Sequence, residues 1–133
     1  MRNRKRKGEW LILISEVNMT DLEFKHFKRL VNKFNKRHDH SKETNPEIRH
    51  DEWCISPVAN TGYYYSYRLV WVDTHYGMVK EIKEWDLYEN SPKELFFDII
   101  PKAEMIVDQY SDYADYSSRE FYDLLKRNYP GIR

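Results

Sequence analysis

The segment with the clearest capacity for chemistry is His38, Asp39 and His40, and His50 follows within the same polar stretch. Two histidines beside an aspartate can bind a divalent transition metal, and histidine takes up or releases a proton near neutral pH. Histidines just after a helix can also simply favour the helix dipole and solvate a loop. A small metal- or histidine-dependent nuclease therefore ranks third among the functions that the sequence suggests. His38, His40 and His50 would be its weak metal site, and we otherwise predict no metal.

Basic side chains gather at the start of the chain, where they can bind phosphate groups or an acidic protein. Residues 1–42 carry 12 basic and 5 acidic side chains, whereas residues 43–133 carry 10 basic and 17 acidic ones. Lysines on the outer side of an amphipathic helix are also ordinary features of a solvated helix. The predicted basic face consists of Arg2, Arg4, Lys5, Arg6, Lys7, Lys25, Lys28, Arg29, Lys33, Lys36 and Arg37.

A second candidate surface lies near the C-terminus, where tyrosines alternate with carboxylates. Tyrosine is enriched at binding surfaces because it combines a large, fairly rigid apolar ring with a hydroxyl group. The same tyrosines can instead pack against the last helix, and the sequence leaves both interpretations open. The predicted acidic face consists of Tyr110, Asp112, Tyr113, Asp115 and Tyr116.

Sequence signatures of enzymes and cofactor sites are missing. The chain has only 4 glycines, and it contains no Gly-rich phosphate loop, no G-x-S-x-G elbow and no Walker lysine. The single cysteine, Cys54, stands between apolar residues of an expected strand, which favours a buried thiol over a reactive one. We therefore predict no catalytic residues and no cofactor, and a non-enzymatic role rather than an enzyme.

Hydrophobic periodicity and capping signals predict the elements that position these residues. Residues 10–17 begin with a continuous apolar run, which indicates a strand that is covered on both sides for part of its length. Thr20 and Glu23 form a capping box, and apolar residues then recur at steps of three and four up to Phe34, which predicts a helix. Residues 38–51 show no period and contain Asn45-Pro46, so we expect a loop.

Three antiparallel strands are predicted next, at residues 53–58, 63–73 and 78–88, and Pro57 places the first of them at a sheet edge. For the hairpin we predict a three-residue loop at residues 75–77, with Gly77 in the left-handed conformation. This register pairs Thr74 with Met78, Val70 with Ile82, Arg68 with Glu84, Tyr67 with Trp85 and Tyr65 with Leu87. It also predicts that Val79 faces the core and that Lys80 faces away from it.

The last third of the chain is predicted to be helical. Ser91 and Pro92 suit the cap and the first position of one helix, and Pro101 should kink or divide that helix. A second capping box, Ser117 with Glu120, opens a short closing helix that ends before residues 130–131, Pro-Gly.

These elements predict an α+β fold with the order β-α-β-β-β-α-α, in which a mainly antiparallel four-stranded sheet carries helices mainly on one face. We expect a flexible basic tail at residues 1–8 and a single α+β domain at residues 9–133. The order resembles that of ribonuclease toxins of the RelE type and, without its first strand, that of the double-stranded-RNA-binding domain. This resemblance concerns element order alone, and such an order hosts many functions.

Composition narrows the class of protein further. Charged residues make up 33% of the chain and the longest apolar run has five residues, which excludes a membrane-spanning protein at this stage. A single cysteine cannot form an internal disulfide, so we expect a cytoplasmic protein without membrane contacts. We expect a non-enzymatic macromolecule-binding protein of the small inhibitor, immunity or mobile-element accessory type, whose partner is another protein. RNA or DNA binding through the basic tail and first helix is the second candidate, and the oligomeric state stays open.

Overall fold

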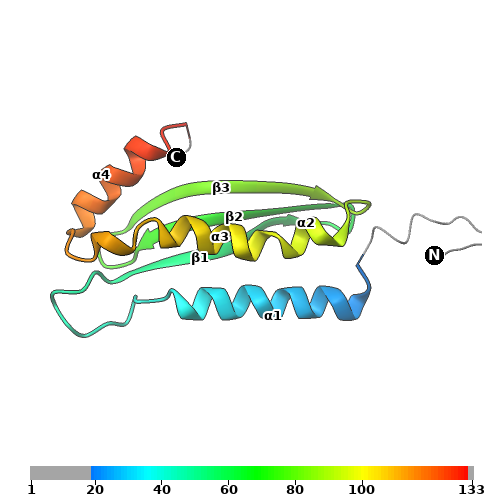
Figure 1. Cartoon of the computed structure of the whole chain (residues 1–133), viewed down its shortest axis with the longest axis horizontal. Helices are drawn as coiled ribbons and strands as arrows, with labels where there is room; N and C mark the ends of the chain where they lie inside the picture. The colour runs from blue at the N-terminus through cyan, green and yellow to red at the C-terminus, as the bar shows by residue number, and fades with distance from the viewer. Residues whose placement is uncertain (1–18, 132–133) are drawn as a thin grey trace, which may run out of the picture.

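The computed structural model describes residues 19–131, which form helices and one antiparallel sheet (Figure 1). In chain order the elements are α1 (Asp21–Arg37), β1 (Asp51–Asn60), β2 (Tyr64–Asp73), β3 (Met78–Tyr88), α2 (Lys93–Phe97), α3 (Ile99–Asp108), the 3-10 helix η3 (Ser111–Tyr113) and α4 (Ser118–Asn128). The strand order is β1-β2-β3. The predicted α+β class, the first helix, the three consecutive antiparallel strands and the closing helix are confirmed.

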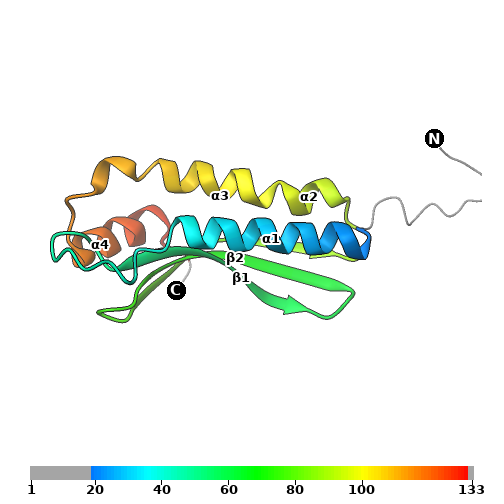
Figure 2. The same cartoon turned by 90° about the horizontal axis from the view of Figure 1, so that it is seen from below.

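Helices α1, α2 and α3 lie on one side of the sheet, which we call its inner face (Figure 2). The inner-face rings of Trp53, Tyr67 and Trp71 are buried. Phe27 of α1 lies 5.3 Å from Tyr67 between ring centres, and Phe121 of α4 lies 5.4 Å from Trp71. Burying these large rings removes apolar surface from water, which is the main stabilising contribution to the fold.

Helix α1 forms where its capping signals place it. The Thr20 side chain accepts a hydrogen bond from the N–H of Glu23 at 3.1 Å, and the Glu23 carboxylate accepts one from the N–H of Thr20 at 2.9 Å. Phe27, Val31 and Phe34 are buried along one side of the helix. The basic residues of α1 must therefore lie on its other sides, because one helical stripe is already packed on the sheet.

The sheet has three strands within residues 19–131, rather than the four that we predicted. The predicted first strand, residues 10–17, and the predicted tail, residues 1–8, lie outside the described residues. Part of the outer edge of β1 is already bonded: the Asn35 side chain accepts from the N–H of Ile55 at 2.8 Å and donates to its carbonyl oxygen at 3.0 Å. The N–H of Trp53 also donates to the carbonyl of His38 at 3.1 Å. A further strand cannot use these backbone groups, because they already have partners.

The β2–β3 hairpin combines two registers. Near the turn, Asp73 pairs with Met78, so the loop has four residues rather than three, and the predicted pairs Thr74–Met78 and Val70–Ile82 are wrong. A β-bulge then shifts the register between Leu69 and Val70, which restores the predicted pairs of Arg68 with Glu84, Tyr67 with Trp85 and Tyr65 with Leu87. Gly77 has φ +69°, the predicted left-handed conformation.

The bulge exchanges the faces of two neighbouring residues. Lys80 opposes Trp71 on the inner face and is 1% exposed, whereas Val79 is 51% exposed. Both predictions for these residues are therefore wrong. A shift of one residue turns each side chain to the opposite face, and the sequence pattern contains no signal for the bulge.

The C-terminal helices begin and end near the positions predicted from the sequence, with one exception in the capping residue. Helix α2 ends at Phe97 and α3 begins at Ile99, with Asp98 between them, so the predicted division of the helix is confirmed. Pro101 lies in the first turn of α3, where its missing N–H has no intrahelical partner to lose. The Ser91 side chain does not cap α2, because its oxygen accepts from the N–H of Tyr88 at 3.0 Å and Pro92 occupies the cap position.

Helix α4 begins with the predicted capping box. The N–H of Glu120 donates to the Ser117 hydroxyl oxygen at 3.2 Å, and the N–H of Ser117 donates to the Glu120 carboxylate at 2.8 Å. The cap fixes the place where the chain turns back toward the sheet. Among the helices of residues 19–131, none has the length and apolar character needed to cross a membrane.

Candidate functional site

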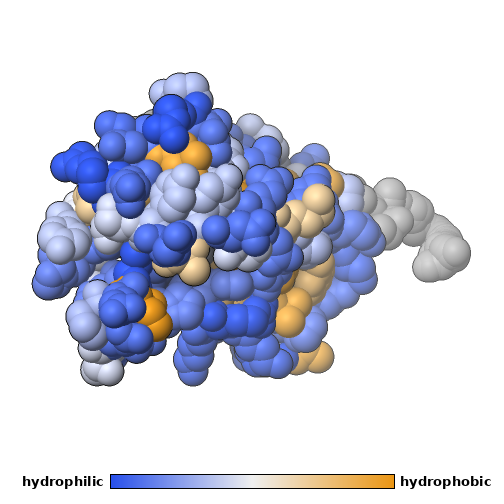
Figure 3. All heavy atoms as spheres, turned by 60° about the vertical axis from the view of Figure 1, so that its left-hand side comes forward, coloured by the Kyte–Doolittle hydropathy of each residue, from blue (hydrophilic) through white to orange (hydrophobic). Residues whose placement is uncertain are grey.

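A cleft of about 870 Å³ lies at the end of the sheet where β2 turns into β3. It opens between the loop before β1, the β2–β3 turn and the start of α4. Figure 3 brings this end of the molecule forward and shows hydrophilic side chains over most of its surface. The polar lining residues include Arg49, His50, Asp73, His75, Tyr76 and Arg119. Three separate segments thus bring residues capable of chemistry into one place.

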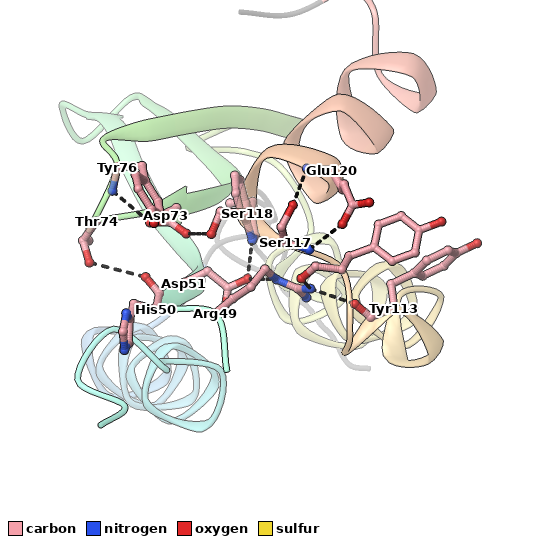
Figure 4. A network of polar contacts seen from close by, with 12 residues as sticks. Arg49, His50, Asp51, Asp73, Thr74, Tyr76, Tyr113, Ser117, Ser118 and Glu120 are labelled. Carbon is pink, nitrogen blue, oxygen red and sulfur yellow. Dashed lines mark hydrogen bonds and ion pairs between the residues drawn. The ribbon is translucent and has the colours of Figure 1, made fainter. Parts of the chain in front are cut away.

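Arg49 lines this cleft and connects the segments around it (Figure 4). Its Nε donates to Oδ2 of Asp51 at 2.9 Å, and one terminal nitrogen donates to the carbonyl oxygens of Tyr113 and Tyr116 at 2.7 and 2.8 Å. The guanidinium carbon also lies 4.0 Å from the ring centre of Phe121, a cation–π contact. The side chain of Arg49 is only 13% exposed. This arginine therefore ties the loop to β1 and to the segment before α4.

Two buried aspartates, Asp51 and Asp73, stand directly opposite each other in the β1–β2 pair, and Asp73 lines the cleft. Asp51 also accepts from the indole N–H of Trp71 at 2.8 Å. Asp73 accepts from the hydroxyl of Ser118 and, at 3.0 Å, from the N–H of Tyr76. Buried carboxylates are costly unless they are hydrogen-bonded, and these bonds meet that need. The aspartates hold the strand ends, the turn and α4 together.

His50 and His75 meet at the cleft, with their ring centres 5.6 Å apart. Two neighbouring imidazoles can supply a general acid and a general base. Arg49 is already bonded to Asp51 and to two carbonyl oxygens, so it belongs to a structural network. Arg119, which also lines the cleft, is exposed and makes no ion pair with a described residue.

The predicted histidine cluster is separated. His38 lies against Phe34 at 4.6 Å between ring centres, and its Nε2 lies 2.7 Å from Oε1 of Glu104. His40 is exposed, while His50 lies beside His75 in the cleft. Within residues 19–131, no three His, Cys, Asp or Glu side chains are grouped so that they could hold a metal ion. The weak metal site that the sequence suggested is not assembled by these residues.

Glu104 is the common partner of Arg37 and His38 at the end of α1. Burial acts to raise the pKa of its carboxyl group, but hydrogen bonds and charge from Arg37 and His38 outweigh burial and hold the pKa below its ordinary value. An ionised Glu104 therefore fastens the end of α1 to α3.

Cys54 is half-buried, and burial raises the pKa of its thiol, with Glu52 and Asp39 adding to the shift. A raised pKa lowers the thiolate fraction near neutral pH. Cys54 is therefore less buried than the sequence predicted, while its raised pKa disfavours the reactive thiolate.

The basic residues of α1 form an exposed face. We define the outer stripe of α1 as Lys25, Arg29, Lys33 and Lys36, which are all exposed. None of these four makes an ion pair with another residue of the described part of the chain. Two further predicted members are engaged elsewhere, since Arg37 pairs with Glu104 and Lys28 lies 5.1 Å from the ring centre of Phe24. The predicted members Arg2, Arg4, Lys5, Arg6 and Lys7 lie outside the described residues.

The predicted acidic face is divided between packing and exposure. Tyr110 is buried among core rings, and Tyr113 and Tyr116 are half-buried with ring centres 5.0 Å apart. Asp112 and Asp115 are exposed. The tyrosines thus contribute mainly to the packing around α4, and the two carboxylates remain at the surface.

Sequence reasoning missed the residues that build the cleft. Arg49 and Asp51 stand in or beside a loop without periodicity, and their partners lie up to 67 positions away. One signal was present: Asp51 and Asp73 flank apolar strands that pair as neighbours, which puts both carboxylates at one end of the sheet. No sequence signal pointed to the hydrogen bond from Ser118 to Asp73, because the neighbouring Ser117 already accounted for the cap of α4.

Comparison with known proteins supplies no relative. No protein-family model matches the chain, and neither a curated protein nor a solved structure matches it. Functional conclusions therefore rest on the two regions described above, the cleft and the outer stripe of α1.

Proposed function

We propose that this chain is a non-enzymatic protein that binds an acidic surface of another protein through the outer stripe of α1. The observation behind this proposal is the outer stripe of α1. Its four members follow one another at intervals of four, four and three residues, so they form a line about 16 Å long at 1.5 Å per residue. The helix contains no acidic residue after Glu23. A small inhibitor, immunity or mobile-element accessory protein would fit this description.

The placement of the stripe supports a contact that does not disturb the core. Phe27, Val31 and Phe34 bury the opposite side of α1, so a partner can approach the cations without displacing any packed group. Because no described residue neutralises these cations, an acidic partner surface would add charge pairs that the fold itself does not make.

The rest of the described chain favours a compact acidic partner over a long nucleic acid. Residues 38–131 carry 10 basic and 18 acidic side chains. A polyanion that extended beyond α1 would meet this net negative charge, whereas an acidic patch on a protein can contact α1 alone. Nucleic acid remains the second candidate, because a line of cations is also what a phosphate backbone binds.

A charge-reversal variant tests the proposal. We would replace Lys25, Arg29, Lys33 and Lys36 by Glu and capture partners from native lysate, with and without nuclease treatment. We expect the original chain to retain an acidic protein after nuclease treatment and the variant to lose it. Circular dichroism should show that the variant is still folded.

A matched control reverses four exposed cations elsewhere, namely Lys42, Lys83, Lys126 and Arg127. This control changes the net charge equally and should keep the partner. Loss of all bound material on nuclease treatment would support nucleic acid instead. Retention of the partner by the α1 variant, with loss by the control, would show that the contact lies off α1.

A further inference from the structure

The sheet has an outer face on the side away from α1, α2 and α3 (Figure 2). Residues that alternate with the inward-facing Tyr67 along β2 point to this outer face, and so do their partners on β3. We define the outer patch as four residues of these pairs near the end of β3, namely Tyr64, Glu84, Asp86 and Tyr88. Both carboxylates are exposed, Tyr64 is half-buried and Tyr88 is 56% exposed. The outer patch therefore presents acidic and aromatic side chains to solvent.

The outer patch keeps its negative charge near neutral pH. The Asp86 carboxylate accepts a hydrogen bond from the Tyr64 hydroxyl at 2.7 Å, and this bond holds the pKa of Asp86 below its ordinary value. Arg68 lies 3.8 Å from Glu84 and also pairs with Glu81, so it offsets only part of the negative charge. A cationic surface is therefore the complement of the outer patch.

The outer stripe of α1 has that charge, and its spacing matches the outer patch. Glu84 and Asp86 lie two positions apart on β3, which separates them by about 6.6 Å at 3.3 Å per residue. Lys25, Arg29 and Lys33 follow one another at intervals of four residues, or about 6 Å along the helix. Two neighbouring cations of the stripe can therefore meet both carboxylates at once, and the tyrosine rings can pack against the lysine stems.

The stripe and the patch cannot meet within one molecule. The buried side of α1 faces the inner face of the sheet, so the stripe points away from the sheet on that side, whereas the outer patch points away on the other (Figure 2). Two outer patches cannot pair with each other either, because like charges would be brought together. Contact between these complementary surfaces therefore requires two copies of the chain.

We infer that the outer stripe of α1 binds the outer patch of a second copy of this chain. The inference rests on the proposed function, because it names the acidic surface that α1 contacts. Each copy offers one stripe and one patch, so the contacts continue head to tail instead of closing into a symmetric pair.

Sedimentation velocity of the purified chain at rising concentration tests the inference. Exposed charge pairs are individually weak, so we expect self-association at low salt with a dissociation constant of about 0.1 to 1 mM. Raising the salt concentration to about 0.5 M should return the chain to a monomer, because the charges are then screened. A chain that stays monomeric at low salt, or an association that salt does not weaken, would overturn the inference.

Neutral variants locate the two halves of the contact. The stripe variant Arg29→Gln with Lys33→Gln and the patch variant Glu84→Gln with Asp86→Asn should each weaken self-association about tenfold. The matched controls change the net charge equally at other exposed positions and should associate like the original chain; they are Lys42→Gln with Arg127→Gln, and Glu47→Gln with Asp112→Asn. Equal weakening by variants and controls would show that net charge alone acts, and would overturn the inference.

A mixture of the two variants restores a single contact. The patch variant keeps its stripe and the stripe variant keeps its patch, so the two should form one-to-one pairs that neither forms alone. In the isotope-labelled patch variant, NMR signals of Lys25 and Arg29 should shift when the stripe variant is added. Shifts confined to residues outside α1 would overturn the inference.

Failure of this inference can be told apart from failure of the proposed function. A chain that stays monomeric but still captures an acidic protein from lysate through α1 would overturn the second copy as partner and keep the proposed function. Self-association that depends on stripe and patch, combined with unchanged lysate capture by the fourfold Glu variant of α1, would do the reverse.

Discussion

The outer stripe of α1 and the cleft at the end of the sheet both gather charged side chains, but the fold uses them in opposite ways. In the cleft, Arg49 makes three hydrogen bonds within the chain, and Asp51 and Asp73 each accept two. On α1, Lys25 and Lys33 are exposed and make no ion pair with any described residue.

This contrast shows that a concentration of polar residues does not by itself mark a binding site. The buried charges of Arg49, Asp51 and Asp73 already have partners, and removing one would leave another buried without compensation. The outer stripe of α1 makes no ion pair with a described residue, so its cations can meet a partner. Substitutions in the cleft should therefore affect stability, whereas substitutions on α1 should affect binding.

The largest effect is expected at the cleft. Arg49→Ala should lower the free energy of unfolding by about 3 kcal/mol, because it leaves the buried Asp51 carboxylate without its cation. Urea denaturation followed by tryptophan fluorescence measures this change. Arg127→Ala, at an exposed position on α4, should change stability by less than about 0.5 kcal/mol. A loss below about 1 kcal/mol for Arg49→Ala would mean that the network is not what holds the cleft.

Substitutions in the outer stripe of α1 should affect partner binding more than stability. Replacing Lys25, Arg29, Lys33 and Lys36 by Glu should weaken partner binding more than tenfold while costing less than about 1 kcal/mol of stability. Some loss of stability is expected because acidic side chains oppose the dipole near the end of α1. Association rates measured at several salt concentrations should reveal the difference. A stability loss as large as that of Arg49→Ala would remove the contrast between the two regions.

His38 and His40 sharpen the comparison, because they are close in sequence and differ in environment. His38→Ala should cost about 1 kcal/mol, since it removes the contact with Glu104 and the packing on Phe34. His40→Ala should cost less than about 0.5 kcal/mol, as usual for an exposed side chain. Thermal unfolding of the two single variants distinguishes them. Equal costs would show that the His38–Glu104 contact contributes nothing.

The smallest effect is a pH dependence at the same contact. The pKa of Glu104 is lower in the folded chain than its ordinary value of 4.5. Its carboxylate therefore stabilises the fold above about pH 4.5, and this stabilisation is lost as the pH falls through the folded-state pKa. The loss should stay below about 1 kcal/mol for a partly exposed pair. Stability profiles between pH 3 and about 7 should be flatter for Glu104→Gln, and identical profiles would exclude the contribution.

The predictable part of the fold followed signals within a few residues. The capping boxes at Thr20 and Ser117 gave the starts of α1 and α4, because a cap joins residues only three positions apart. Pro101 gave the boundary between α2 and α3 for the same local reason. The hairpin pattern gave most of the β2–β3 pairs, but the bulge placed Lys80 in the core and Val79 at the surface.

The two candidate regions differ in the same respect: one follows from a local sequence pattern and the other from tertiary contacts. The sequence by itself determined the outer stripe of α1, because helical periodicity fixes which side chains oppose the buried phenylalanines. Only the tertiary structure decided the cleft, where Arg49 reaches carbonyl oxygens 64 and 67 positions further along the chain and Ser118 reaches Asp73 across 45. Such contacts depend on how sheet and helices pack, and packing is set by many distant side chains together rather than by any local pattern.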